Sequence, residues 1–169
     1  NGYLDINNTG GSGAGIRCNS AGTFYAGNAA QGDLAIYVQD NTNNSIILQA
    51  NTGEKYLEAN MGGSVDVYHH GTKKFETIST GIKVLGSEGG NAEIEIFGDE
   101  GDDNNDKWKL MTNANANFYL QNYGAGSWQN SILARPTGAT ELYNTGNLKL
   151  ATTTTGVTVT GDISATDDI

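Results

Sequence analysis

The sequence predicts an all-β protein built from short antiparallel hairpins stacked along an axis. Apolar residues alternate with polar ones along most of the chain, as they do along half-buried strands; Ile94 and Ile96, for example, alternate with Glu93 and Glu95. Glycine-containing turn signals separate these runs. A stretch of 24 residues also occurs twice, and such repetition is typical of structures built by stacking similar units.

The expected strands follow the alternating runs in chain order. In the first half of the chain they lie at 3–6, 14–18, 23–26, 33–38, 45–49, 55–60, 64–68, 73–78 and 82–85. In the second half they lie at 92–97, 107–112, 117–121, 130–134, 139–143, 147–152 and 156–160. Turn signals such as His70-Gly71 separate them, because glycine adopts the positive φ that a tight hairpin needs. On each strand we expect the polar residues to face water.

The repeat divides the chain. Residues 63–86 and 138–161 align without a gap and are identical at nine of 24 positions. These positions are Gly63/Gly138, Tyr68/Tyr143, Gly71/Gly146, Lys74/Lys149, Thr77/Thr152, Thr80/Thr155, Gly81/Gly156, Val84/Val159 and Gly86/Gly161. We therefore expect a first β-module at 1–86, a second at 87–161, and the start of a following segment at 162–169.

The apolar composition is too thin for an ordinary isolated core. Leu, Ile, Val and Phe together number 33 of 169 residues, and the net charge is -10, which approaches the composition of disordered chains. Because the apolar residues alternate and there is one proline, we interpret the chain as ordered, with a core completed by two further copies in an intertwined homotrimer. The expected turn glycines are Gly71, Gly81, Gly146 and Gly156. The expected shared-core residues are Val67, Phe75, Ile82, Val84, Leu142, Leu150, Val157 and Val159.

Charge and composition exclude several classes of partner. Nine basic residues against 19 acidic ones argue against nucleic acid and anionic membranes, which both attract clusters of Lys and Arg. The single cysteine, Cys18, cannot form an intrachain disulfide. No apolar stretch approaches membrane-spanning length, and no signal peptide is visible. The chain begins with Asn1, so we expect a fragment of a longer protein.

The repeat follows the pattern Y-x2-G-x2-K-x-x-T-x2-TG-[IV]-x-V-x-G. It reads VDVYHHGTKKFETISTGIKVLG at 65–86 and TELYNTGNLKLATTTTGVTVTG at 140–161. This pattern resembles modules of tail-fibre proteins from tailed bacteriophages, especially marine and cyanobacterial ones. Segments 32–48 and 91–134 also look like units of those fibres, so the resemblance covers roughly residues 32–161.

The resemblance implies a trimeric, β-rich structural segment of a virion tail fibre, a shaft or knob used in host-cell attachment. Such a chain is made in the cytoplasm of the bacterial host and located in the virion. Its expected partners are its own copies, other virion tail components and, as a further candidate, a host surface glycan or receptor. No cofactor is expected.

Two polar clusters are candidate metal sites. In the acidic loop 99–106, Asp102, Asn104 and Asp106 match the start of a calcium loop. Lys107 then stands where such a loop needs glycine, so we favour a hairpin loop whose Asp and Asn side chains cap turns. His69 and His70 could meet their copies on a trimer axis and bind a metal, but adjacent residues point to opposite faces of a strand, which favours an exposed turn. We therefore commit to no metal site.

Aromatic residues suggest an alternative function. Trp108, Tyr119, Tyr123 and Trp128 lie among Asn and Gln, a composition common on sugar-binding surfaces, although we favour packing of Trp108 in the module core and of Trp128 across strands. Motifs of nucleophilic, metal-dependent or phosphate chemistry are absent from the sequence, so we expect no enzyme. The alternatives left open are a glycan-binding tip and, with less support, a polysaccharide-degrading tailspike or a cellular adhesin.

Overall fold

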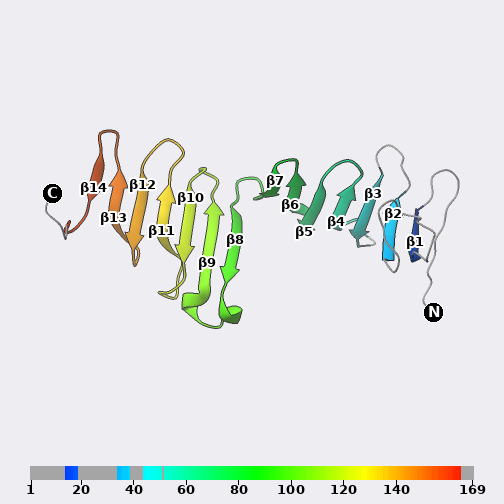
Figure 1. Ribbon diagram of the computed structural model, residues 1–169, viewed down its shortest axis with the longest axis horizontal. Coiled ribbons are helices and arrows are strands. Elements are labelled where there is room, and N and C mark those ends of the chain that lie inside the picture. Colours follow the sequence, from blue (N-terminus) through cyan, green and yellow to red (C-terminus); the bar gives the residue numbers. More distant parts are fainter. Residues whose placement is uncertain (1–13, 19–33, 39–43, 51, 165–169) are drawn as a thin grey trace. The chain divides into compact units, whose positions relative to one another are not determined.

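The computed structural model describes residues 14–18, 34–38, 44–50 and 52–164. The chain forms two compact units, 1–83 and 84–169. In both units the regular structure consists of antiparallel strands, joined in the second unit by two short 3-10 turns (Figure 1). The all-β prediction is confirmed.

The first unit contains a two-stranded and a five-stranded sheet. Strands β1 (Ala14–Cys18) and β2 (Leu34–Val38) pair with each other. The five-stranded sheet follows the order of the sequence. Its strands are β3 (Ser45–Gln49), β4 (Lys55–Asn60), β5 (Val65–His69), β6 (Thr72–Ile78) and β7 (Gly81–Val84).

The second unit is one seven-stranded sheet, again in sequence order (Figure 1). Its strands are β8 (Ala92–Phe97), β9 (Lys107–Thr112), β10 (Phe118–Asn122), β11 (Gln129–Ala134), β12 (Thr140–Asn144), β13 (Asn147–Thr152) and β14 (Val157–Val159). The 3-10 turns η1 (Asp99–Gly101) and η2 (Asn104–Asp106) lie between β8 and β9.

The strand positions expected from alternation are confirmed to within one residue at each end wherever the structure describes the chain. The strands expected at 3–6 and 23–26 lie outside the described residues. One feature differs in detail from separate stacked hairpins. Successive hairpins also pair with each other, so that they merge edge to edge into wider sheets.

The two copies of the repeat form the same hairpin. A β-bulge falls between Val67 and Tyr68 in one copy and at the equivalent step from Leu142 to Tyr143 in the other. The repeated threonine has the same role in both copies. The Val65 N–H donates to Thr77 Oγ1 at 2.9 Å, and the equivalent Thr140 N–H donates to Thr152 Oγ1 at 2.9 Å. The sequence identity at this threonine therefore reflects a backbone-binding side chain.

The repeated turns require glycine. In the first hairpin His70 and Gly71 have φ of 48° and 70°, and in the second Thr145 and Gly146 have φ of 50° and 73°. Two successive residues with positive φ define the two-residue turn whose twist matches that of a hairpin. The turn role expected for Gly156 rests on different geometry, because Gly156 is absent from the described residues with positive φ.

The structural repeat is longer than the sequence match. Leu57 on β4 lies opposite Val67, and Ile132 on β11 lies opposite Leu142 at the same 75-residue spacing. The equivalence therefore extends upstream, and β4–β7 correspond to β11–β14. The hairpin β8–β9 comes between the two copies.

One face of the second unit carries an unbroken line of aliphatic side chains. Cross-strand partners join them in register across all seven strands: Ile94, Leu110, Leu120, Ile132, Leu142, Leu150 and Val159, here called the aliphatic row. Every member is half-buried or exposed. Because this unit is a single layer, no second sheet within it covers the row. A shorter line in the first unit joins Leu48, Leu57, Val67 and Phe75.

Around Asp66, burial within one chain is the reverse of the expectation that polar residues face water and apolar residues are covered. Among the described residues the buried ones are Leu133, Asp66 and Lys109, and the last two are 3% and 7% exposed. Val65 and Val67, on either side of Asp66 in the sequence, are both 39% exposed. The expectation that Asp66 faces water is wrong, because long polar side chains on its face cover one another while the aliphatic face lacks a covering layer.

We expect Gly146→Ala to destabilise the protein more than Gly71→Ala. Both substitutions force an L-residue into the left-handed region, which costs about 1–2 kcal/mol. At Gly146 the new Cβ would meet Gln129 Oε1, so this side-chain end must rotate away and its hydrogen bond to Ser127 is disturbed, whereas nothing lies within 4 Å at Gly71. Thermal unfolding at one fixed protein concentration measures the difference.

The matched control is Gly156→Ala, which meets open space and needs no positive φ. It should change the unfolding free energy by less than about 0.5 kcal/mol. Equal effects of Gly146→Ala and Gly156→Ala would contradict the assigned turn geometry.

Candidate functional site

A charged network covers the polar face of the first unit. Its centre is the buried Asp66, whose Oδ2 lies 2.8 Å from Lys73 Nζ. The Asn60 side-chain amide donates to the same oxygen at 3.4 Å, and the Tyr68 hydroxyl donates to Glu58 at 3.0 Å. Asp66 Oδ1 is buried and has no hydrogen-bond partner within the part of the chain that the structure describes. The carboxylate is therefore held firmly on one side.

The network keeps its carboxylates ionised. Burial raises the pKa of Asp66, but hydrogen bonds from Lys73 and Ser64 outweigh burial, so its pKa lies below the usual value. Hydrogen bonds to Asp66 and Glu76 raise the pKa of Lys73. Hydrogen bonds from Lys73 and Lys83 lower the pKa of Glu76. At neutral pH these groups are ion pairs rather than proton donors or acceptors.

In the second unit the equivalent carboxylate also has a cationic partner, but a different residue supplies it. Glu141 is equivalent to Asp66, and its cation is Arg135 on the neighbouring turn. Hydrogen bonds from Arg135 and Tyr143 lower the pKa of Glu141. The position equivalent to Lys73 is Leu148. A cation is thus present next to the repeated carboxylate in both copies, but it comes from a different strand position.

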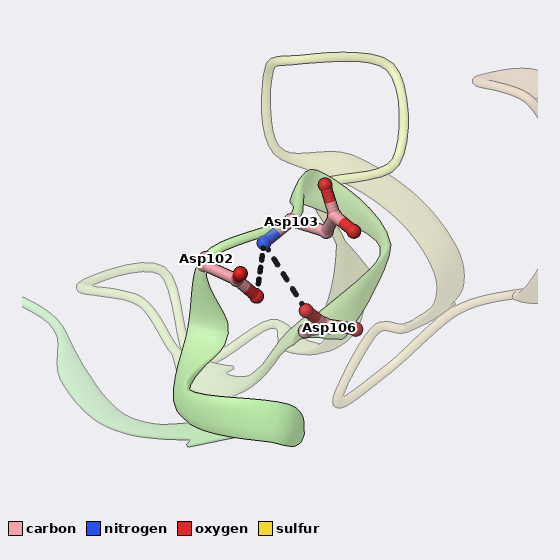
Figure 2. A group of neighbouring side chains, drawn as sticks. All are labelled: Asp102, Asp103 and Asp106. Carbon is pink, nitrogen blue, oxygen red and sulfur yellow. Dashed lines mark hydrogen bonds between the residues drawn. The ribbon is translucent and has the colours of Figure 1, made fainter.

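The acidic loop brings three carboxylates together. Ligand atoms of Asp102, Asp103 and Asp106 lie within 4.8 Å of one another (Figure 2). The Asp103 N–H donates to Asp102 Oδ1 at 3.0 Å and to Asp106 Oδ2 at 3.2 Å, as the dashed lines in Figure 2 show. The Asp103 side chain in turn accepts from the Asp106 backbone, which completes a capping box around η2.

This geometry confirms the turn-capping role expected for the loop. Asp102 and Asp103 are exposed, and the hydrogen bonds of all three carboxylates account for their proximity. Calcium binding by this loop stays a prediction.

The two histidines lie at an exposed hairpin end. Their rings are 4.4 Å apart in an edge-on arrangement, and His70 Nδ1 lies 3.5 Å from Glu54 Oε1. The His70 side chain is 82% exposed. The expected exposed turn is confirmed, and a metal on a trimer axis stays untested.

The aromatic residues do not form one surface. Lys109 Nζ lies 4.4 Å from the centre of the Trp128 ring, and Trp128 also packs edge-on against Tyr123 at 5.2 Å. Trp128 therefore covers a buried lysine, which Glu93 also contacts at 3.4 Å. Trp108 and Lys109 are successive strand residues and point to opposite faces. Trp108 is 40% exposed and shares its face with the aliphatic row.

Two hollows indent the second unit. An apolar groove of about 180 Å³ lies over β8–β10 and is lined by Val84, Ala92, Glu93, Ile94, Leu110, Met111, Thr112 and Phe118. A polar hollow of about 420 Å³ lies at the loop ends of β10–β12. This polar hollow is lined by Asn122, Gly124, Ala125, Gln129, Tyr143, Asn144 and Thr145.

Sequence reasoning missed the charged networks. The pair Lys73-Lys74 reads as a solvated face, and only the strand register shows that Lys73 meets Asp66. The equivalent acidic position Asp66/Glu141 is visible in the repeat, so a search for a cation near both copies could have found Arg135. The comparisons with known proteins add no residue roles. No family model, curated protein or solved structure matches the chain. Among the described residues no helix is long and apolar enough to cross a membrane.

We expect an arginine placed in the first copy, at the position equivalent to Arg135, to replace Lys73 as the partner of Asp66. Lys73→Leu should lower the unfolding free energy by about 1–3 kcal/mol, because the buried Asp66 loses its charged hydrogen-bond partner. Adding Asn60→Arg places an arginine at the position equivalent to Arg135 and should recover at least half of that loss. Urea unfolding of the two variants at equal concentration measures both effects.

Lys83→Met is the control, because its exposed pair with Glu76 should contribute less than about 1 kcal/mol. If Asn60→Arg further destabilised the Lys73→Leu protein, the two copies would not share one electrostatic design.

Proposed function

We propose that this chain is a structural segment of a bacteriophage tail fibre. Three copies form a β-rich shaft or knob that takes part in host-cell attachment, located in the virion and joined to other tail components. Its role is mechanical rather than enzymatic, and it uses no cofactor.

The aliphatic row is the observation that best supports the proposed trimer. A sheet with an apolar face needs a second layer to cover it. In the second unit seven aliphatic side chains lie in register without such a layer, and Leu133 is the one buried apolar residue among those described. Further copies of the same chain supply the missing layer in this proposal, and the thin apolar composition is then sufficient. The virion assignment is supported by the sequence pattern of the repeat.

Four carboxylates of the charged networks are unsuited to the acid role that a polysaccharide-degrading tailspike needs. Glycoside hydrolysis needs one carboxyl group that is protonated at the working pH. The pKa of Glu58, Asp66, Glu76 and Glu141 is lowered by hydrogen bonds from neighbouring groups. At neutral pH these four carboxylates are therefore ionised and do not serve as the acid. Recognition of a surface glycan is the second candidate function, and the uncharged polar hollow is the feature that favours it.

We expect the chain to be a trimer in solution, with a mass three times the 17.8 kDa of one chain. Val159→Lys places a charge at the end of the aliphatic row and should shift the population to smaller species. Light scattering coupled to size exclusion measures the mass over a range of concentrations.

The matched control is Thr158→Lys, one residue away on the opposite face of the same strand. It should leave the mass unchanged. A wild-type monomer, or equal effects of the two variants, would overturn the trimer.

The virion role has its own test. An antiserum raised against the purified chain should label the tails of phage particles whose genome encodes it, and should reduce adsorption to the host. Labelling of the bacterial surface in cells without phage would instead indicate the adhesin.

A further inference from the structure

A continuous chain of charged side chains crosses the polar face of the first unit. Lys73 Nζ on β6 lies 2.8 Å from Asp66 Oδ2 on β5 and 2.8 Å from Glu76 Oε2 on its own strand. Lys83 on β7 extends the chain at one end, with its Nζ 2.6 Å from Glu76 Oε1. Ion pairs thus join β5 to β6 and β6 to β7 in addition to the backbone hydrogen bonds of the sheet.

The same chain continues to β4. The Tyr68 hydroxyl on β5 donates to Glu58 Oε2 on β4 at 3.0 Å and lies 3.5 Å from Asp66 Oδ2. Lys55 Nζ lies 2.7 Å from Glu58 Oε1. The side-chain amide of Asn60, also on β4, donates to Asp66 at 3.4 Å. Three carboxylates therefore share one connected set of partners that spans β4–β7, with the buried Asp66 at its centre.

The second copy of the repeat carries apolar side chains in place of two of these three carboxylates. The equivalent positions are Glu58/Leu133, Asp66/Glu141 and Glu76/Ala151. In both copies the central carboxylate is the direct cross-strand partner of the other two residues. Leu133 is buried, at 5% exposed. The same place in the fold thus holds three carboxylates in the first unit, and one carboxylate beside a buried leucine in the second.

Protonation of the three carboxylates opposes folding of the first unit. The pKa of Glu58 and of Glu76 is lowered by hydrogen bonds from neighbouring side chains, and for Asp66 such bonds outweigh burial, which raises the pKa. Because the folded-state values lie below the unfolded ones, the stability from this network is complete above about pH 4.5. It is lost as the pH falls through the lowered values, where the unfolded chain binds more protons than the folded unit.

The two units differ in the size of this effect. Each proton taken up on unfolding shifts the unfolding equilibrium by up to about tenfold per pH unit. The three carboxyl groups of the first network together give up to about a thousandfold per pH unit, against about tenfold for Glu141. Lys73 stays charged in acid and loses both anionic partners, whereas Leu133 has no charge to lose.

We propose that the first unit is an acid-sensitive element, which opens at a pH at which the second unit is still folded. Opening starts in β4–β7, where the ion pairs join successive strands. Compact units of one chain open separately when each is cooperative by itself. The inference goes beyond the proposed function, because it applies to a monomer as well as to a trimer.

Hydrogen exchange of the full chain, measured by mass spectrometry, follows both sheets in one sample. The protein is labelled at several values from about pH 7 to about pH 3, with labelling times scaled to the intrinsic exchange rate at each pH. We expect peptides from β4–β6 to lose at least about tenfold more protection than peptides from β10–β12. Equal losses in the two sheets, or an earlier loss in β10–β12, would overturn the proposal.

Neutral isosteres should reproduce the acid form at neutral pH. The triple variant Glu58→Gln, Asp66→Asn, Glu76→Gln should show at about pH 7 the low protection of β4–β6 that the wild-type protein shows at about pH 3. Its β10–β12 peptides should stay protected, and this protection shows that the rest of the chain is folded. Full protection of β4–β6, or loss of protection in both sheets, would contradict the proposal.

The matched control is Glu54→Gln, which removes a carboxylate of the same unit outside the network. Glu54 contacts the exposed His70 at 3.5 Å, so its loss should change the protection of β4–β6 by less than about fivefold at each pH. If this control opened β4–β6 as far as the triple variant does, the network would not be the acid-sensitive part. The mass of the wild-type protein tests the trimer separately, because a monomer with the expected acid response would overturn the trimer alone.

Discussion

The structure depends on one constraint, namely that the five-stranded and the seven-stranded sheet are each a single layer with an aliphatic face. Antiparallel meanders satisfy the backbone hydrogen bonds of all inner strands locally, but they leave one face of the side chains uncovered. In the second unit that face is the continuous aliphatic row, from Ile94 on β8 to Val159 on β14. The apolar residues are too few to build two layers from one chain. Whatever covers the row therefore decides whether the sheet is stable.

The opposite face is held together by charge rather than by apolar packing. Asp66 and Glu141 stand at equivalent positions, and each has a cation within reach, Lys73 in one copy and Arg135 in the other. A buried carboxylate without a cation is costly, so the two substitutions are coupled even though they fall on different strands. The repeat thus conserves an electrostatic requirement within one chain, and the identity of the residues that meet it is free to change.

Alternation and turn chemistry were sufficient to predict the strands, because strand period and positive-φ turns are local properties. They predicted the hairpins around Gly71 and Gly146 for the right physical reason. They failed for Asp66, because its burial depends on which residues lie opposite it, and the bulge after Val67 sets that register. The acidic loop was half predictable. Its turn-capping role follows from residue type, but the pairing of Asp103 with Asp106 depends on the path of the loop.

The hairpin β8–β9 distinguishes the second unit from the first, although their repeats agree. It adds two strands to the aliphatic row, and it carries Lys109, on one face, and Trp108, on the other. Lys109 lies against the Trp128 ring. Gly124 and Ala125, in the loop before Trp128, border the polar hollow. Trp108 stands beside Asn122 at the same end of the sheet. The features that distinguish the second unit thus come from residues inserted between the copies, acting on turn positions where the copies themselves diverge.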